Sequence, residues 1–244
     1  MIKTVHIAVY CRETALKAGA LLTLKTIRVG FPTATLHVYW AGDDETVERQ
    51  CKAACVKAQA EFVRSGETQA QLMRRMTSTS DECFAFVDSD VVFFEQCEGF
   101  ESCGMLAGEF IPQFVCPIAR AITVARLHSA FLIVRDPVAL REELHRVYQP
   151  MMARHCPFDP FTGVVTWHDG RPWFRDVAAN LYHAVGGESF GPDMLRRFEH
   201  LYAGSYSDLV SPEHRAQLEA AYANPETARG FRKVMDKFFS DRSL

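Results

Sequence analysis

Apolar positions along the first part of the chain follow two different periods. Residues 5–10 and 35–40 are short apolar and β-branched runs, whereas residues 14–29 and 45–62 place apolar side chains at helical spacing, the first of these stretches ending at Gly30. A strand–helix–strand–helix order with short connections is typical of a parallel sheet with crossover helices.

The same criteria predict the remaining elements. They are, in order, a helix over 69–76, a strand over 83–87 that continues into 91–94, a strand over 126–134, helices over 138–148 and 172–185, a short strand or loop over 198–202, and two C-terminal helices. Residues 95–117 and 150–170 are expected to be irregular. No repeat or linker interrupts the pattern, so one domain is predicted, with a nucleotide-sugar-binding half (1–95), an acceptor-side half (96–205) and C-terminal helices (206–244).

Composition narrows the class of protein. The chain has 244 residues, 48% of them hydrophobic, and a net charge of -3, so we expect one buried core and no general nucleic-acid binding. No apolar run is long enough for a signal peptide or a membrane span. The eight cysteines form no CxxC pair and are interpreted as reduced thiols of a cytoplasmic protein, at most peripheral to a membrane.

The main candidate site residues follow the end of the strand predicted over 83–87. There an apolar run leads directly into Asp88 and Asp90, and apolar residues resume at once. On an extended backbone, side chains two positions apart point to the same side, and the carboxyl end of a parallel strand faces the ligand crevice of an α/β sheet. Two adjacent carboxylates repel each other unless a cation compensates them, and oxygen ligands suit Mg²⁺ or Mn²⁺. An Asp-x-Asp pair alone is also common in acidic turns, so the strand–helix context carries the interpretation.

This arrangement resembles the DxD motif of GT-A-fold glycosyltransferases. In that family the motif binds a divalent cation, usually Mn²⁺, that bridges the two phosphates of a nucleotide sugar. The resemblance implies that Asp90 ligates Mn²⁺ (or Mg²⁺), that Asp88 binds the metal or the ribose, and that Ser89 belongs to the nucleotide-sugar site. It also implies a GT-A-like (Rossmann-like), mixed and mostly parallel sheet flanked by helices, with additional C-terminal helices.

Two further segments extend the resemblance. The first strand ends at Tyr10 and Arg12, where the family's first loop receives the nucleobase and ribose; Arg12 could equally be a surface residue of that loop. His200, followed by Gly204, is similar to a His-aromatic-x-Gly segment that supplies a third metal ligand in several retaining members, although its spacing is offset by one residue. An imidazole ligand favours Mn²⁺ over Mg²⁺.

Residues 167–170 resemble the acceptor-side segment of such enzymes. If the reaction inverts the anomeric centre, a carboxylate should accept the proton of the acceptor. Asp169 and Asp176, at the start and in the first turn of the helix predicted there, are the candidates. Both positions also suit a helix cap or the helix dipole. His168 and His128 are further candidates for the base.

The sequence therefore predicts a metal-dependent glycosyltransferase of the hexosyltransferase type. Its donor would be a nucleoside-diphosphate sugar, with a UDP-sugar expected, and its acceptor a saccharide, a lipid-linked group or a protein. Two alternatives stay open, as does the oligomeric state. A haloacid-dehalogenase-type phosphohydrolase would use Asp88 as the nucleophile, but the only lysines after Asp90 are Lys233 and Lys237, and no Asp-Asp pair follows. A non-catalytic nucleotide-sugar-binding protein of the same fold would keep the acidic pair without turnover.

Overall fold

The fold is known from a computed structural model. It describes residues 1–9, 16–101, 103–116, 121–152, 160–161, 163–168, 170–175, 177–201 and 212–231. The strands are β1 (Thr4–Val9), β2 (Thr35–Trp40), β3 (Glu61–Arg64), β4 (Phe84–Asp88), β5 (Val91–Phe93), β6 (Leu106–Ile111), β7 (Phe114–Cys116), β8 (Ala121–Thr123), β9 (Arg126–Val134), β10 (Val164–His168), β11 (Arg171–Arg175), β12 (Glu188–Ser189) and β13 (Phe198–His200). The helices are α1 (Leu16–Gly30), α2 (Glu45–Ala58), α3 (Gln69–Thr79), α4 (Pro137–Met152), α5 (Ala179–Val185), α6 (Pro192–Leu195), α7 (Pro212–Ala223) and the 3-10 helix η2 (Pro225–Ala228).

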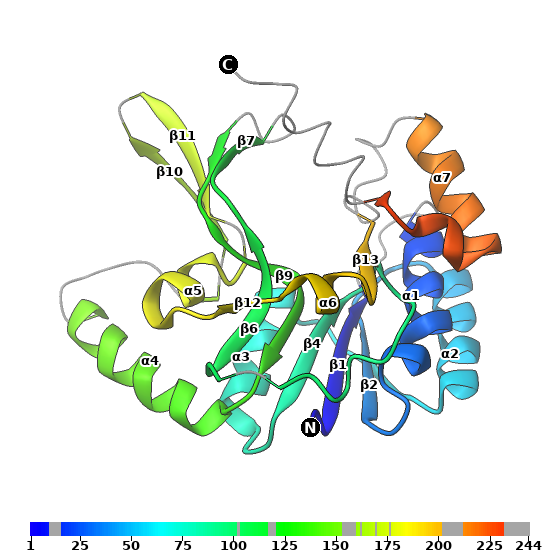
Figure 1. The fold of residues 1–244 in the computed structure, drawn as a ribbon, viewed down its shortest axis with the longest axis horizontal. Coiled ribbons are helices and arrows are strands. Elements are labelled where there is room, and N and C mark those ends of the chain that lie inside the picture. Colours follow the sequence, from blue (N-terminus) through cyan, green and yellow to red (C-terminus); the bar gives the residue numbers. More distant parts are fainter. Residues whose placement is uncertain are drawn as a thin grey trace.

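The central sheet has seven strands in the order β12-β6-β9-β4-β1-β2-β3. Strand β1 pairs in parallel with β2 and β4, and β2 pairs in parallel with β3, whereas β9 runs antiparallel to both β4 and β6. Helices α1 and α2 lie on the right of Figure 1 and α4 and α5 on the left. This is the mixed, mostly parallel α/β architecture that the sequence predicts.

Each face of the sheet carries its own apolar layer, because side chains alternate along a strand. On β1, Val5, Ile7 and Val9 pack with the residues of α1 and α2, whereas Ala8 packs with those of α3. Every one of these four side chains is completely buried. Burying an aliphatic side chain of the size of valine or leucine contributes about 1.5–3 kcal/mol. Strand β4 is packed in the same way, with Ala85 and Val87 in the first layer and Phe84 and Phe86 in the second.

Two of the predicted helices are wrong in extent or type. The helix expected over 45–62 ends at Ala58, since Gln59 adopts a left-handed conformation (φ 52°) and caps it, and β3 follows. The helix expected over 172–185 is the strand β11 followed by the short helix α5. Aromatic side chains favour the strand, and Gly170, at φ 73°, lies in the turn between β10 and β11.

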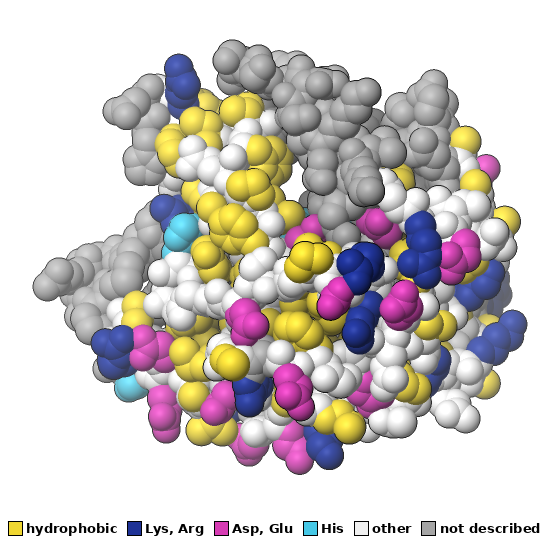
Figure 2. All heavy atoms as spheres, viewed as in Figure 1, with side chains coloured by type: hydrophobic (Ala, Val, Ile, Leu, Met, Phe, Trp, Pro, Cys, Tyr) yellow, Lys and Arg dark blue, Asp and Glu magenta, His cyan; other side chains and the backbone are white. Residues whose placement is uncertain are grey.

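The segments expected to be irregular also contain strands. Strands β6 and β7 lie within 95–117, and β10 lies within 150–170. A second sheet, in the order β10-β11-β8-β7, forms an arm at the upper left of Figure 1, where the chain continues from β6 into β7 and from β8 into β9. Hydrophobic side chains gather over this arm (Figure 2), and Trp167 on β10 is 70% exposed.

The C-terminal part is only partly described. Helix α7 begins at Pro212, as the sequence predicts, and packs on α1. Phe231, the first apolar residue of the last predicted helix, is buried with Leu22 and Val92, and the rest of that helix lies outside the described residues. Within the described residues, no helix is long and apolar enough to cross a membrane.

Candidate active site

The acidic pair lies where β4 ends in the middle of the central sheet. Asp88 is the last residue of β4, Ser89 and Asp90 form a turn, and β5 then leaves the central sheet to pair with β13. Ser89 and Asp90 are buried, at 5% and 3% exposure, and Asp88 is half-buried. A buried carboxylate requires a partner, because removing an isolated charge from water is costly.

The partner of Asp90 is His200. Strands β5 and β13 are antiparallel and place His200 opposite Val91. This register brings Nε2 of His200 to 3.1 Å from Oδ1 of Asp90, and both side chains are buried. Two residues that the sequence assigns to one cation site therefore meet, although they come from distant parts of the chain.

Asp88 is held from the opposite side. Its Oδ2 accepts a hydrogen bond from Nε2 of Gln69 at 3.1 Å, and its Oδ1 accepts one from the backbone amide of Ser89 at 2.9 Å. Gln69 is the first residue of α3, so the position of this helix sets the orientation of the Asp88 carboxylate.

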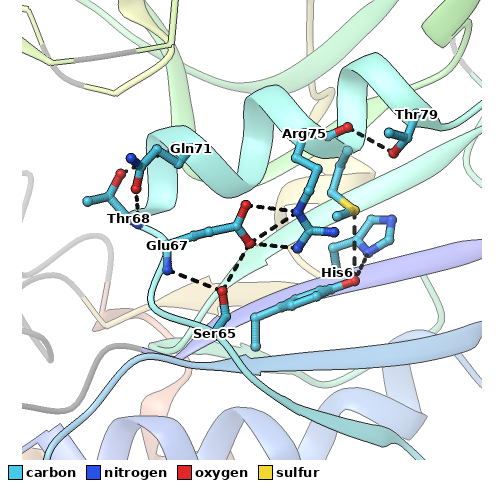
Figure 3. A network of polar contacts seen from close by, with 9 residues as sticks. His6, Ser65, Glu67, Thr68, Gln71, Arg75 and Thr79 are labelled. Atoms are coloured by element: carbon cyan, nitrogen blue, oxygen red, sulfur yellow. Dashed lines mark hydrogen bonds and ion pairs between the residues drawn. The ribbon is translucent and has the colours of Figure 1, made fainter.

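The start of α3 is anchored by a polar network (Figure 3). Thr68 and Gln71 form a reciprocal capping box, in which Oε1 of Gln71 accepts from the amide of Thr68 at 2.8 Å. Glu67 accepts from Nε and Nη2 of Arg75, at 2.8 and 2.7 Å. Gln69 therefore projects from a helix end that is fixed by the capping box and by the ion pair between Glu67 and Arg75.

A distortion of β9 adds two more polar side chains near the site. The register passes from Gly108 opposite Leu132 to Phe110 opposite Leu127, so two steps along β6 correspond to five along β9. Bulges of this kind often redirect side chains next to active sites. Here Glu109, 6% exposed, lies in β6 across from the irregular stretch.

His128 lies within the irregular stretch of β9 itself. Its ring centroid is 4.4 Å from that of His200. The backbone amide of Ala130 donates to Nδ1 of His128 at 3.1 Å, so in the neutral ring the proton is on Nε2. In the sequence analysis His128 is one of the further candidates for the catalytic base, and nothing there indicates a role for Glu109.

The electrostatics of the site are dominated by carboxylates. Burial lowers the pKa of His200. The carboxylate of Asp90, in close contact with the ring, acts in the opposite direction, and Glu109 and Asp88 add to this effect. Together the three carboxylates outweigh burial and raise the pKa of His200 above its ordinary value. Three acidic side chains thus act on one buried imidazole. Such a site favours a bound positive charge.

The residues present fit a divalent cation as a partial ligand set. Metal–ligand bonds of about 2.1 Å place neighbouring octahedral ligands about 3.0 Å apart, close to the 3.1 Å between Asp90 and His200. Among the described residues, no three His, Cys, Asp or Glu side chains converge as a complete metal site. Mg²⁺-type sites typically use one or two protein ligands and leave other positions to substrate phosphates and water.

Four of the predicted site residues lie outside the described residues. These are Tyr10, Arg12, Asp169 and Asp176. Their proposed roles stay predictions. In sequence, Asp169 falls between β10 and β11, and Asp176 follows β11. Strand β11 thus takes the place of the first turns of the helix at whose start both residues were expected.

Comparisons with known proteins identify the fold. No protein-family model matches the chain, and no curated protein sequence matches it at a significant level. The fold is similar to that of the glycosyltransferase GlyE from Streptococcus pneumoniae TIGR4, with a TM-score of 0.52 and 10% identity over 100% of this chain. The chain spans 66% of the length of that GlyE chain. Fold class is thereby established as that of GT-A glycosyltransferases, in agreement with the prediction from sequence.

Two further solved structures show weaker similarity. The galactosyltransferase LgtC, in complex with donor and acceptor sugar analogues, gives a TM-score of 0.45 at 11% identity, over 87% of this chain and 81% of that chain. The mannosyltransferase PcManGT from Pyrobaculum calidifontis, in complex with GDP-Man and Mn²⁺, gives 0.38 at 11% identity, over 59% and 45%. The activity of the present chain therefore has to be argued from its own site.

Proposed function

We propose that this chain is a metal-dependent glycosyltransferase that takes a sugar from a nucleoside-diphosphate sugar. The observation that carries the proposal is the contact between Asp90 and His200, 3.1 Å apart and buried, at the carboxyl end of β4. This is the edge of an α/β sheet at which ligands bind. The glycosyltransferase fold shared with GlyE supports the same activity.

Each acidic or imidazole side chain of the site has its own proposed role. Asp90 and His200 would hold the cation, with Mn²⁺ preferred over Mg²⁺ because one ligand is an imidazole nitrogen. Asp88, oriented by Gln69, would bind the metal or the donor ribose. When bound, the cation stabilises the negative charge that develops on the departing nucleoside diphosphate. A UDP-sugar is the proposed donor.

The remaining assignments belong to the same proposal. Tyr10 and Arg12 would contact the nucleobase or phosphates, and Asp169 or Asp176 would accept the proton of the acceptor hydroxyl. Residues 1–95 would form the nucleotide-sugar half and 96–205 the acceptor half of the protein. The shared glycosyltransferase fold does not favour the phosphohydrolase reading of Asp88.

Release of nucleoside diphosphate tests the proposal. Purified protein is incubated with UDP-, GDP-, CDP-, dTDP- and ADP-sugars, each with Mn²⁺ and with EDTA, and the free diphosphate is measured. Slow donor hydrolysis does not require a known acceptor, so we expect Mn²⁺-dependent release from one donor class. Release of inorganic phosphate from phosphate monoesters, without diphosphate release from any donor, would instead support the phosphohydrolase.

A further inference from the structure

The peptide group that joins Asp90 to Val91 is held by two hydrogen bonds. The carbonyl oxygen of Asp90 accepts a hydrogen bond from the amide of Leu201 at 2.8 Å. The amide of Val91 donates to Oγ1 of Thr23 at 3.1 Å. Because the carbonyl and the amide belong to the same planar peptide, these two bonds fix its orientation.

The hydroxyl of Thr23 provides the acceptor that a neighbouring strand would otherwise offer to β5. One edge of β5 pairs with β13, and its other edge faces α1. There Thr23 accepts from Val91, and Thr26 accepts from the amide of Phe93 at 3.1 Å. Both threonines are buried, so they supply acceptors that water could not.

The two threonines differ in what they support. Val91 directly follows Asp90 and pairs with His200, whereas Phe93 pairs with Phe198, further along β5 and away from the acidic pair. A rotation of the Asp90–Val91 peptide would move the Asp90 carboxylate and the strand partner of His200 together. A change at Phe93 would leave both in place.

We propose that Thr23 is a positioning residue of the cation site. Its hydroxyl orients the Asp90–Val91 peptide so that the carboxylate of Asp90 and the imidazole of His200 present their donor atoms to one cation. The inference rests on the proposed function, since it concerns the same site. Thr26 is its matched counterpart: it is also buried on α1, and its hydroxyl accepts from the amide of Phe93 instead of that of Val91 while donating to the carbonyl of Leu22 at 3.0 Å.

The test compares Thr23→Val with Thr26→Val. Valine keeps the shape of threonine and removes the acceptor, so both variants should lose thermal stability. Affinity for Mn²⁺ in the presence of UDP is measured from the electron paramagnetic resonance signal of free Mn²⁺. We expect Thr23→Val to weaken it on the order of tenfold, as outer-shell substitutions at metal sites do. Thr26→Val should leave it unchanged, and Thr23→Ser should restore it. Equal affinities in the two valine variants would overturn the inference.

A second measurement separates this inference from the proposed function. In metal-free protein, the ¹⁵N resonance of His200 Nε2 reports its contact with the Asp90 carboxylate, 3.1 Å away. We expect Thr23→Val to shift it and Thr26→Val to leave it in place. If the wild-type protein binds no Mn²⁺, the proposed function fails, and these resonances alone decide whether Thr23 positions the pair. If Thr23→Val does not fold, Thr23→Ala, which leaves room for a water molecule at the Val91 amide, takes its place.

Discussion

Nε2 of His200 lies 3.1 Å from Oδ1 of Asp90, and the antiparallel pairing of β5 with β13 sets this distance. Both side chains are buried, so this contact places an acidic group directly against an imidazole that can carry a positive charge. A divalent cation with ligands at this separation could bind both donor atoms without a change in backbone. In the proposed function, this geometry prepares the site for a cation at the carboxyl end of β4, the edge of the sheet where α/β proteins bind ligands.

Asp90→Asn should abolish Mn²⁺-dependent nucleotide binding and leave the fold intact. The substitution removes the ligand charge but keeps the volume of the side chain. Binding is measured by isothermal titration with Mn²⁺ and UDP, and folding by circular dichroism. Asp193→Asn, at an exposed position on α6, is the control and should bind as the wild type does. Wild-type Mn²⁺-dependent affinity in Asp90→Asn would exclude the metal role of this residue.

His200→Ala should weaken Mn²⁺ binding less than Asp90→Asn does. The imidazole is a neutral ligand when bound to a metal, so its loss removes a bond and no ligand charge. His200→Ala should also reduce the preference for Mn²⁺ over Mg²⁺, because oxygen ligands alone suit Mg²⁺. Diphosphate release with each metal measures both effects. An unchanged metal preference and affinity would return His200 to a purely structural role.

Gln69→Ala should raise the KM for the donor about tenfold, because a hydrogen bond to a charged group contributes about 1.5–3 kcal/mol. Without Gln69, the carboxylate of Asp88 loses the contact that orients it. Gln71→Ala is the matched control on the same helix, since it breaks the capping box but not the contact with Asp88. The control should lower the thermal stability and keep the KM. The reverse pattern, with KM changed only in Gln71→Ala, would show that Asp88 depends on the helix end alone.

His6 should make the fold acid-sensitive. Burial, then the charges of His37 and Arg75, lower the pKa of His6 from 6.5 to about 3, and its Nδ1 lies 3.2 Å from the hydroxyl of Tyr39. Between these two pH values the unfolded chain binds a proton at His6 that the folded chain does not. The contribution of His6 to the free energy of unfolding is therefore complete above about pH 6.5, and it falls by about 1.4 kcal/mol for each pH unit below that value.

The measurement for His6 is urea unfolding from pH 7 to pH 4. His6→Asn removes the titrating group, so the difference in the free energy of unfolding between the wild type and this variant should shrink as the pH falls. His145→Asn, at an exposed position on α4, serves as the comparison and should keep the steep pH dependence. Parallel curves for the wild type and His6→Asn would contradict the assignment.

Local patterns were enough to predict the centre of the fold. The segments that form β1, β2, β4 and β9 are rich in apolar residues, and Asp88 and Asp90 interrupt such a run abruptly. Two competing local signals explain the error around β11. Pro172 is typical of a first helical turn, whereas the Asp169-Gly170 pair is typical of a hairpin. In the structure Pro172 pairs with Trp167 across the hairpin, so the segment is a strand.

The supporting residues of the site have no local signature. Gln69 and Thr23 are ordinary helix residues in sequence, and each acquires its role only when a strand end is placed beside it. Glu109 likewise becomes part of the site through the irregular register between β6 and β9. These contacts are set by the packing of elements far apart in the chain, which single-sequence patterns do not contain.

A thermal-shift panel tests the central claim most directly. UDP, GDP, CDP, dTDP and ADP are each added with Mn²⁺ and with EDTA, and the unfolding temperature is recorded. A ligand at a hundred times its dissociation constant stabilises the folded state by about 2.7 kcal/mol. We predict that one nucleotide, UDP, raises the unfolding temperature with Mn²⁺ and not with EDTA, and that Asp90→Asn abolishes the shift. The absence of a metal-dependent shift with every nucleotide would contradict a nucleotide-sugar site at Asp88 and Asp90.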